Sequence, residues 1–195
     1  MRRWARVRRR SLGVIGFLLL SACAFTPHNV TVDPKVTMAD SDIGNGTRVY
    51  FRFVDERDDT VVGHRAAGTM GAKVTADNLP HVVETTLRDG LVKKHFTLSD
   101  QQAGTDASVI YRLRSFKFDI ETGFFTGGRN SAAALAVEAR RGERSYDKVY
   151  RFNDETRIVF LPGESEIDQQ MNGALSDILD KALSDTDLDR MLAGH

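Results

Sequence analysis

This chain of 195 residues contains little cysteine, tryptophan or proline, with one Cys, one Trp and four Pro. A single cysteine excludes an intramolecular disulfide framework and any zinc cluster built from several cysteines. Hydrophobic residues make up 41% of the chain, which is a globular composition. The length fits one domain.

A net charge is also absent, because 27 basic groups balance 27 acidic groups, but the balance is uneven along the chain. Six arginines lie within the first ten residues, and residues 1–22 contain no acidic group. Without that segment, 21 basic groups remain against 27 acidic ones, a net charge of about −6. An acidic domain is unsuited to nucleic acid or to an anionic lipid surface, so neither is an expected partner.

The sequence lacks a hydrophobic run long enough for a permanent transmembrane anchor. Its apolar stretch near the amino terminus, Leu12–Leu20, spans only about 15 Å as a helix, half of what a bilayer core requires. A basic stretch precedes it and small residues follow it, which is the layout of a secretory signal. Residues 1–22 are therefore predicted to be a signal peptide.

The segment Leu20-Ser21-Ala22-Cys23 resembles the lipobox of bacterial lipoproteins, in which a diacylglyceryl group is attached to the cysteine thiol. Cleavage then leaves that cysteine as the first residue. The alternative is that Cys23 is an unmodified thiol just past an ordinary cleavage site. Acylation explains the lone cysteine better, since an unpaired thiol is a liability in an oxidising compartment. Two or three acyl chains hold a soluble domain on a membrane where one chain does not.

Ala24 follows the lipobox cysteine. In lipoproteins of the enteric type, the absence of Asp at this position goes with sorting to the outer membrane. The expected location is the inner leaflet of the bacterial outer membrane, facing the periplasm. Arg9-Arg10-Ser11-Leu12 also resembles a twin-arginine export signal, so export by either the Sec or the twin-arginine route stays open.

Turn-forming residues dominate the segment 23–47, which is predicted to be the lipidated cysteine and a tether. Fully extended, this tether reaches roughly 80 Å. Val30 and Val32 alternate with polar residues, which suggests a short edge strand that ends at Pro34. Residues 48–195 are expected to form a single folded domain.

Hydrophobic periods of two and of 3.6 residues predict the elements of that domain. Strands are expected over residues 48–54, 108–120, 133–140 and 146–152, and residues 156–161 are apolar enough to extend the sheet. A shift of the alternation near Arg114 and Ser115 predicts a β-bulge. Helices are expected over 79–94 and 165–183, with a short turn after 185.

Two helices with one apolar stripe each need apolar strand faces to cover those stripes. The predicted fold is therefore α+β: a two-layer sandwich with a largely antiparallel sheet and two main helices packed on one face.

Catalytic motifs are missing from the sequence. The five histidines show no pairing at i, i+3 or i, i+4, and there is no His-Glu-x-x-His motif, nucleophile elbow, P-loop or dinucleotide-binding fingerprint. We therefore expect no enzymatic activity, no metal and no cofactor.

Two groups of residues are candidate sites besides Cys23. Asp55 and Arg57 follow the strand 48–54 and Arg65 comes soon after, so these three side chains either bind a polar ligand or brace a loop. Phe124 and Phe125 lie in the glycine-containing segment 123–128, a predicted hairpin tip. They either contact a partner or pack on the end of the sheet.

The order of these features resembles the YajG-type lipoproteins of Gram-negative bacteria. The likeness rests on the lipobox, on Val-Thr-Val-Asp-Pro in the tether, and on Val54-Asp55-Glu56-Arg57 and Val62-Gly63-His64-Arg65 after the first strand. The central helix and the acidic carboxyl-terminal helix complete it. The resemblance implies a lipoprotein of the cell envelope and supplies no ligand or catalytic residue.

The sequence leaves three hypotheses about function. The first is a non-enzymatic, periplasm-facing lipoprotein of the outer membrane that binds or scaffolds an envelope component. The second rests on a likeness to auxiliary lipoproteins of ABC-type lipid transport systems, and it predicts an apolar groove between the helices and the sheet. The third is a cell-wall enzyme or peptidoglycan binder.

Overall fold

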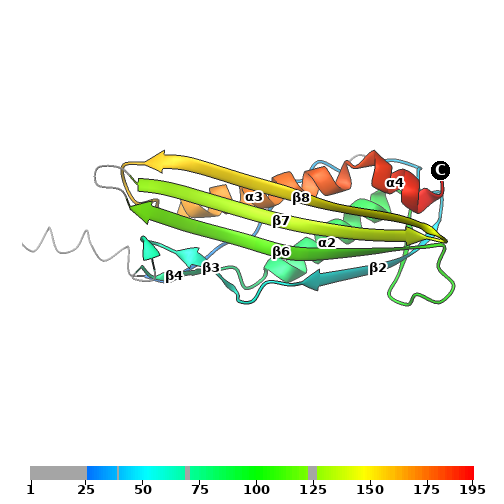
Figure 1. Ribbon diagram of the computed structural model, residues 1–195, viewed down its shortest axis with the longest axis horizontal. Coiled ribbons are helices and arrows are strands. Elements are labelled where there is room, and N and C mark those ends of the chain that lie inside the picture. Colours follow the sequence, from blue (N-terminus) through cyan, green and yellow to red (C-terminus); the bar gives the residue numbers. More distant parts are fainter. Residues whose placement is uncertain (1–25, 39, 69–70, 123–126) are drawn as a thin grey trace, which may run out of the picture.

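The structure is a computed structural model that describes residues 26–38, 40–68, 71–122 and 127–195 (Figure 1). Its strands are β1 (His28–Asn29), β2 (Arg48–Asp55), β3 (Val61–His64), β4 (Lys73–Thr75), β5 (Thr97–Ser99), β6 (Ala107–Thr122), β7 (Gly127–Arg141) and β8 (Arg144–Ile158). Its helices are α2 (Leu79–Lys93), α3 (Glu164–Leu183) and α4 (Thr186–Ala193). The main predicted strands and both predicted helices are confirmed, while the sequence did not indicate β4.

Strand β6 is the centre of the sheet. On one side it pairs in parallel first with β2 and then with β3, and on the other side it pairs with β7 in antiparallel. The register shifts between Leu113 and Ser115, which confirms the predicted bulge. This bulge lies where β6 passes from β2 to β3, so the bend that it introduces separates the two partners.

The sheet is mixed, and the prediction of a largely antiparallel sheet is wrong. Within the described residues, four of the seven strand pairings are parallel: β1 with β4, β2 with β5, β2 with β6 and β3 with β6. For the two pairings of β2 the reason is α2: after β2 the chain passes through this helix and re-enters the sheet on either side of β2, as β5 and β6. Parallel neighbours need a long crossover connection, and a helix usually provides it.

The antiparallel part of the sheet is the long meander of β6, β7 and β8. Its second turn contains Gly142, whose φ of 58° is in the left-handed region that glycine adopts without strain. Strand β8 continues to Ile158, further than the predicted strand. Residues 159–161 leave the sheet, so the expected extension of the sheet stops at Ile158.

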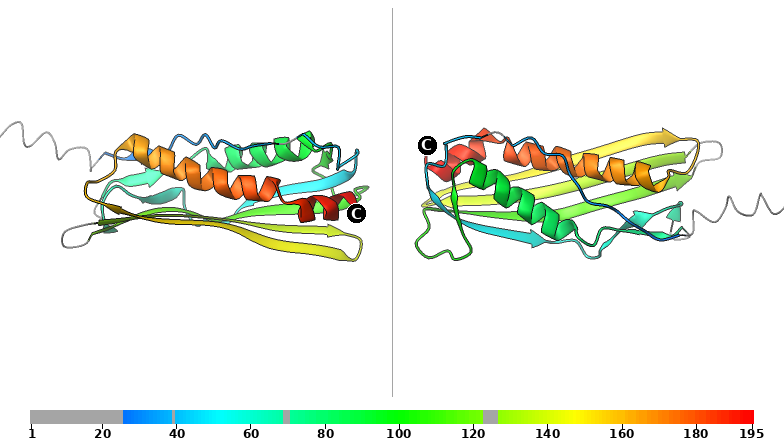
Figure 2. Two further views of the ribbon diagram at one scale, coloured as in Figure 1. Left: turned by 90° about the horizontal axis from the view of Figure 1, so that it is seen from above. Right: turned by 180° about the vertical axis from the view of Figure 1, so that it is seen from behind.

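The three helices lie on one side of the long strands β6, β7 and β8 (Figure 2). Helix α3 packs on β7 and β8, and α2 packs on β2, β5 and α3. The side chains between these elements are fully buried, among them Leu87, Leu113, Leu135, Leu175 and Ile178. None of the helices in the described part of the chain is long and apolar enough to cross a bilayer.

Residues 30–38, which we call the strap, lie along α3 and do not form a free tether (Figure 2). Backbone N–H groups at alternate residues of the strap donate hydrogen bonds to side chains of α3, and the successive acceptors are four residues apart. The bonds join Asp33 to Asn172 (2.7 Å), Lys35 to Ser176 (2.8 Å) and Thr37 to Asp180 (2.7 Å). The periods match because two extended residues and four helical residues each advance about 6 Å.

The alternate side chains of the strap point into the protein. Val30 is 1% exposed and Val32 is 7% exposed, while Val36 and Met38 are partly buried against the core. The predicted tether is therefore wrong from residue 26 onward, and in place of the predicted edge strand the structure has the short β1 followed by this strap. The alternation in Val-Thr-Val correctly predicted an extended segment with one buried face. The partner of the segment is a helix, however, and local periodicity does not identify the partner.

Candidate functional site

Asp55 and Arg57 form a bidentate ion pair at the end of β2, in which Nη1 of Arg57 is buried without a partner among the described residues. The Arg57 guanidinium donates two hydrogen bonds to the Asp55 carboxylate, at 2.9 and 2.8 Å, and the Arg57 backbone N–H donates a third at 3.2 Å. The Arg57 side chain is only 6% exposed. A carboxylate already held in this bidentate way braces its own loop.

Arg65 belongs to a different group, at the beginning of α3. Its Nη1 atom donates to the backbone carbonyl of Thr26 at 3.2 Å and to Glu164 Oε1 at 2.7 Å. Beside it, His28 Nε2 lies 2.6 Å from Asp168 Oδ1. These side chains fix the point where the described chain begins against the first turn of α3. The structure thus separates Arg65 from Asp55 and Arg57, and a ligand for either group stays a prediction.

The other predicted sites, Cys23, Phe124 and Phe125, lie outside the described residues. In the part of the chain that the structure describes, no group of three or more His, Cys, Asp or Glu residues is arranged to hold a metal ion.

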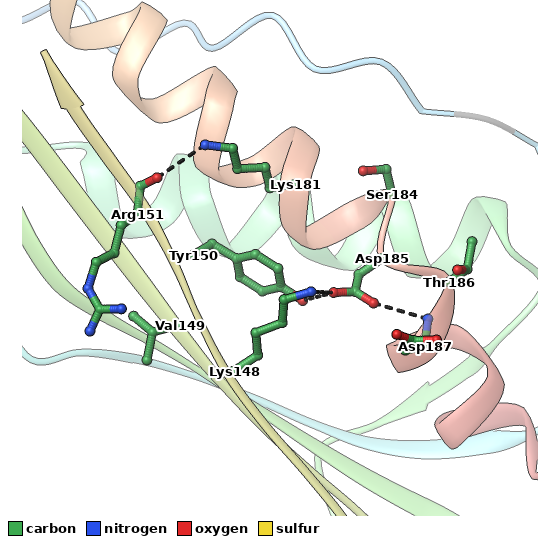
Figure 3. A pocket seen from close by; sticks show the side chains of 9 residues that line it. All are labelled: Lys148, Val149, Tyr150, Arg151, Lys181, Ser184, Asp185, Thr186 and Asp187. Carbon is green, nitrogen blue, oxygen red and sulfur yellow. Dashed lines mark hydrogen bonds and ion pairs between the residues drawn. The ribbon is translucent and has the colours of Figure 1, made fainter.

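A hollow of about 540 Å³ lies between β8 and the junction of α3 with α4 (Figure 3). It is lined by residues of β8 and by the ends of both helices: Lys148, Val149, Tyr150, Arg151, Lys181, Ser184, Asp185, Thr186 and Asp187. The sequence did not indicate this hollow, because its two sides are about 35 residues apart in the chain.

Asp185 is the centre of this hollow and is 8% exposed. Its Oδ2 accepts hydrogen bonds from Tyr146 (2.8 Å), Lys148 (2.5 Å) and Tyr150 (2.8 Å). Its Oδ1 caps α4 by accepting from the backbone N–H groups of Asp187 and Leu188. Both oxygens are therefore fully engaged in joining β8 to α4.

These contacts set the pKa values of the group. Burial alone raises the pKa of Asp185, but the hydrogen bonds from Lys148, Tyr146 and Tyr150 outweigh it and hold the pKa well below its ordinary value. Burial and the nearby carboxylate raise the pKa of Tyr150. The pKa of the partly exposed Lys148 is raised by its hydrogen bond to Asp185. A carboxylate that is ionised at neutral pH and whose two oxygens already accept hydrogen bonds is a poor general base, so the cluster acts as a structural lock.

A second lock lies behind the first, in the interior. Lys94 and Asp189 are each 6% exposed, and Lys94 Nζ lies 2.7 Å from both carboxylate oxygens of Asp189. Lys94 also donates to the backbone carbonyl of Leu183. Burial raises the pKa of Asp189 and the ammonium of Lys94 opposes that rise. From the sequence, Lys94 was placed only as the last residue of the predicted helix 79–94.

The buried hydroxyl of Tyr111 has no hydrogen-bond partner among the described residues. Burial, followed by the charges of Asp189 and Asp185, raises its pKa far above the ordinary value. Tyr111 thus stays neutral and contributes its ring, which lies 5.9 Å from that of Phe51, to the core.

Comparison with known proteins adds a family and a fold. A family model described as "Uncharacterized lipoprotein" matches residues 34–193. No curated protein matches the chain.

Among solved structures, protein XCC0632 from Xanthomonas campestris is 12% identical, with a TM-score of 0.53. The match covers 87% of this chain and 96% of that one. Lipoprotein GNA1162 from Neisseria meningitidis is 8% identical with a TM-score of 0.34, over 66% of this chain and 94% of that one. The Xanthomonas likeness extends to the fold alone.

Proposed function

Because this chain belongs to the uncharacterised lipoprotein family whose model matches residues 34–193, we propose that it is a non-enzymatic lipoprotein acylated at Cys23. It is anchored in the inner leaflet of the outer membrane, faces the periplasm, and binds or scaffolds another envelope component. Within the family, the motifs after β2 and in the strap favour the YajG type.

The observation that carries the proposal is the lipobox Leu20-Ser21-Ala22-Cys23 just ahead of a domain of a lipoprotein family. Thr26, three residues after the cysteine, is already bonded to Arg65. Three residues span at most about 10 Å, so the acyl chains would hold this end of the domain close to the lipid headgroups.

A scaffolding role is supported by the side of the sheet that faces away from the helices. On the described chain, no helix covers that side of β6, β7 and β8 (Figure 2). It carries a connected set of charges, in which Arg112 donates to Glu56 at 3.0 Å and to Glu138 at 3.1 Å. The side that no described helix covers is available for contact with another protein.

The alternative, a subunit that hands lipid to a transport complex, requires an apolar groove between the helices and the sheet. In the described residues that space is filled by fully buried side chains, among them Leu87, Leu113 and Ile178. This closed core gives the alternative no support.

Intact mass and membrane fractionation of the native protein test the proposal. We expect a species that begins at Cys23, carries the added mass of acyl chains and is found in outer-membrane fractions. A Cys23→Ser variant loses the acyl mass and leaves the membrane. The matched variant Ser21→Ala keeps the thiol and is expected to keep both. An unmodified wild-type protein in the soluble periplasm would overturn the proposal.

A further inference from the structure

We propose that residues 159–161, an exposed apolar loop between β8 and α3, insert into the surface of the bilayer that the acyl group anchors. This inference rests on the proposed function, because it takes acylation at Cys23 as given. It adds a second membrane contact, made by the folded domain itself, which fixes how the domain is oriented on the membrane.

The loop is unusual because it exposes three consecutive large apolar side chains. Val159, Phe160 and Leu161 are 76%, 85% and 49% exposed. The only other large hydrophobic residue exposed to this degree in the described chain is Val92. Three consecutive exposed apolar residues are costly in a soluble protein unless a partner covers them.

The geometry of the loop holds these side chains out from the protein. The pairing of β8 ends at Ile158, opposite Gly127. Pro162 is buried, and Gly163 is the N-cap of α3, with its N–H bonded to Glu166. The loop is thus fixed at both ends, and its three apolar residues lie beyond the end of the sheet, so they do not fold back on the core.

The position of the loop identifies the bilayer as the occupant. Glu164, three residues after Leu161, shares the Arg65 guanidinium with the carbonyl of Thr26. The beginning of the described chain and the loop therefore lie at the same end of the molecule, opposite α4 (Figure 1). Since Cys23 lies within about 10 Å of Thr26, its acyl chains enter the membrane beside the loop.

The charges around the loop favour an apolar contact over an electrostatic one. Exposed Arg157 precedes the loop, while Glu164 and Glu166 follow it. The surroundings are of mixed sign, as suits a zwitterionic surface. Insertion is therefore expected to persist in vesicles without anionic lipid and at high salt, unlike the binding of a polybasic segment.

A tryptophan probe tests the inference, because the only natural tryptophan, Trp4, lies ahead of Cys23 and is absent from the processed protein. The acylated Phe160→Trp protein is reconstituted in phosphatidylethanolamine vesicles with and without brominated acyl chains. The control is Val92→Trp, at the end of α2 next to Lys94, whose partner Asp189 lies in α4 at the far end. The state of Cys23 is read by intact mass in each sample.

We expect the emission of Phe160→Trp to shift to shorter wavelength in vesicles and to lose most of its intensity to the brominated chains. The emission of Val92→Trp stays unshifted and unquenched. Adding Val159→Ser and Leu161→Ser to the Phe160→Trp chain reduces the quenching.

Acylated protein in which neither probe is quenched, or in which both are quenched alike, would overturn the inference and leave the anchor intact. Unacylated protein whose Phe160→Trp probe is not quenched would overturn the inference and the proposed function together. Unacylated Phe160→Trp protein that is quenched more than unacylated Val92→Trp protein would support the loop and overturn the anchor, because Trp4, if retained, is present in both.

Discussion

Replacing Lys94 with methionine is expected to lower the free energy of unfolding by about 3–5 kcal/mol, the usual cost of removing one partner from a buried ion pair. Both groups of the Lys94–Asp189 pair are 6% exposed. Without Lys94, the carboxylate of Asp189 and the carbonyl of Leu183 lose the ammonium that they share. Urea denaturation followed by far-ultraviolet circular dichroism measures the change.

Two further variants separate this cause from general damage to α2. Lys93→Met changes an exposed lysine next in sequence and is expected to shift stability by less than about 0.5 kcal/mol. The double variant Lys94→Met/Asp189→Leu removes both charges and is expected to recover most of the loss. A Lys94→Met protein as stable as wild type would show that the pair does not hold α4 in place.

Asp185→Ala is expected to destabilise the protein by about 3 kcal/mol at pH 7. About 1 kcal/mol of this is the lost N-cap of α4, and the rest is the charge-assisted hydrogen bonds from β8. Asp185→Asn keeps a capping oxygen and removes the charge, so we expect an intermediate loss. Asp187→Ala, whose exposed carboxylate pairs with exposed Arg190, is the control and is expected to cost less than about 1 kcal/mol.

The contribution of Asp185 to the free energy of unfolding depends on pH. Its pKa in the folded protein lies below the unfolded value of about 3.9, so its stabilising contribution is fully present above that value. As the pH falls below about 4 this contribution is lost. The stability difference between wild type and Asp185→Ala is therefore expected to shrink in denaturation curves recorded from pH 5 down to pH 2. A difference that is constant over this range would contradict the depressed pKa.

Local sequence patterns were sufficient for the elements with one apolar face. The alternation of Val49, Phe51 and Phe53 predicted β2, and the shift at Arg114 predicted the bulge in β6, because both signals depend only on near neighbours. The direction of the strands was predicted wrongly, since the parallel pairings of β2 depend on where the chain re-enters the sheet after α2. That choice is made by long-range packing.

The polar locks could not be predicted for the same reason. Asp185 lies 35 to 39 residues from the side chains that donate to it, and Lys94 lies 95 residues from Asp189. In the sequence alone, Asp185, Lys94 and Asp189 cannot be told apart from ordinary helix caps and surface charges. Asp55 and Arg57 were found because they are two residues apart, whereas the partner of Arg65 is 99 residues away.

Neutron reflectometry of the acylated protein on a supported bilayer measures whether the folded domain lies directly on the membrane. If the strap binds α3, only residues 23–25 separate the lipid from the domain, and protein density begins within about 10 Å of the headgroups. A free tether over residues 23–47 would instead leave a dilute, water-filled layer of about 25–30 Å. We expect dense protein directly on the headgroups, and a water-filled gap of that thickness would show that residues 23–47 are a free tether.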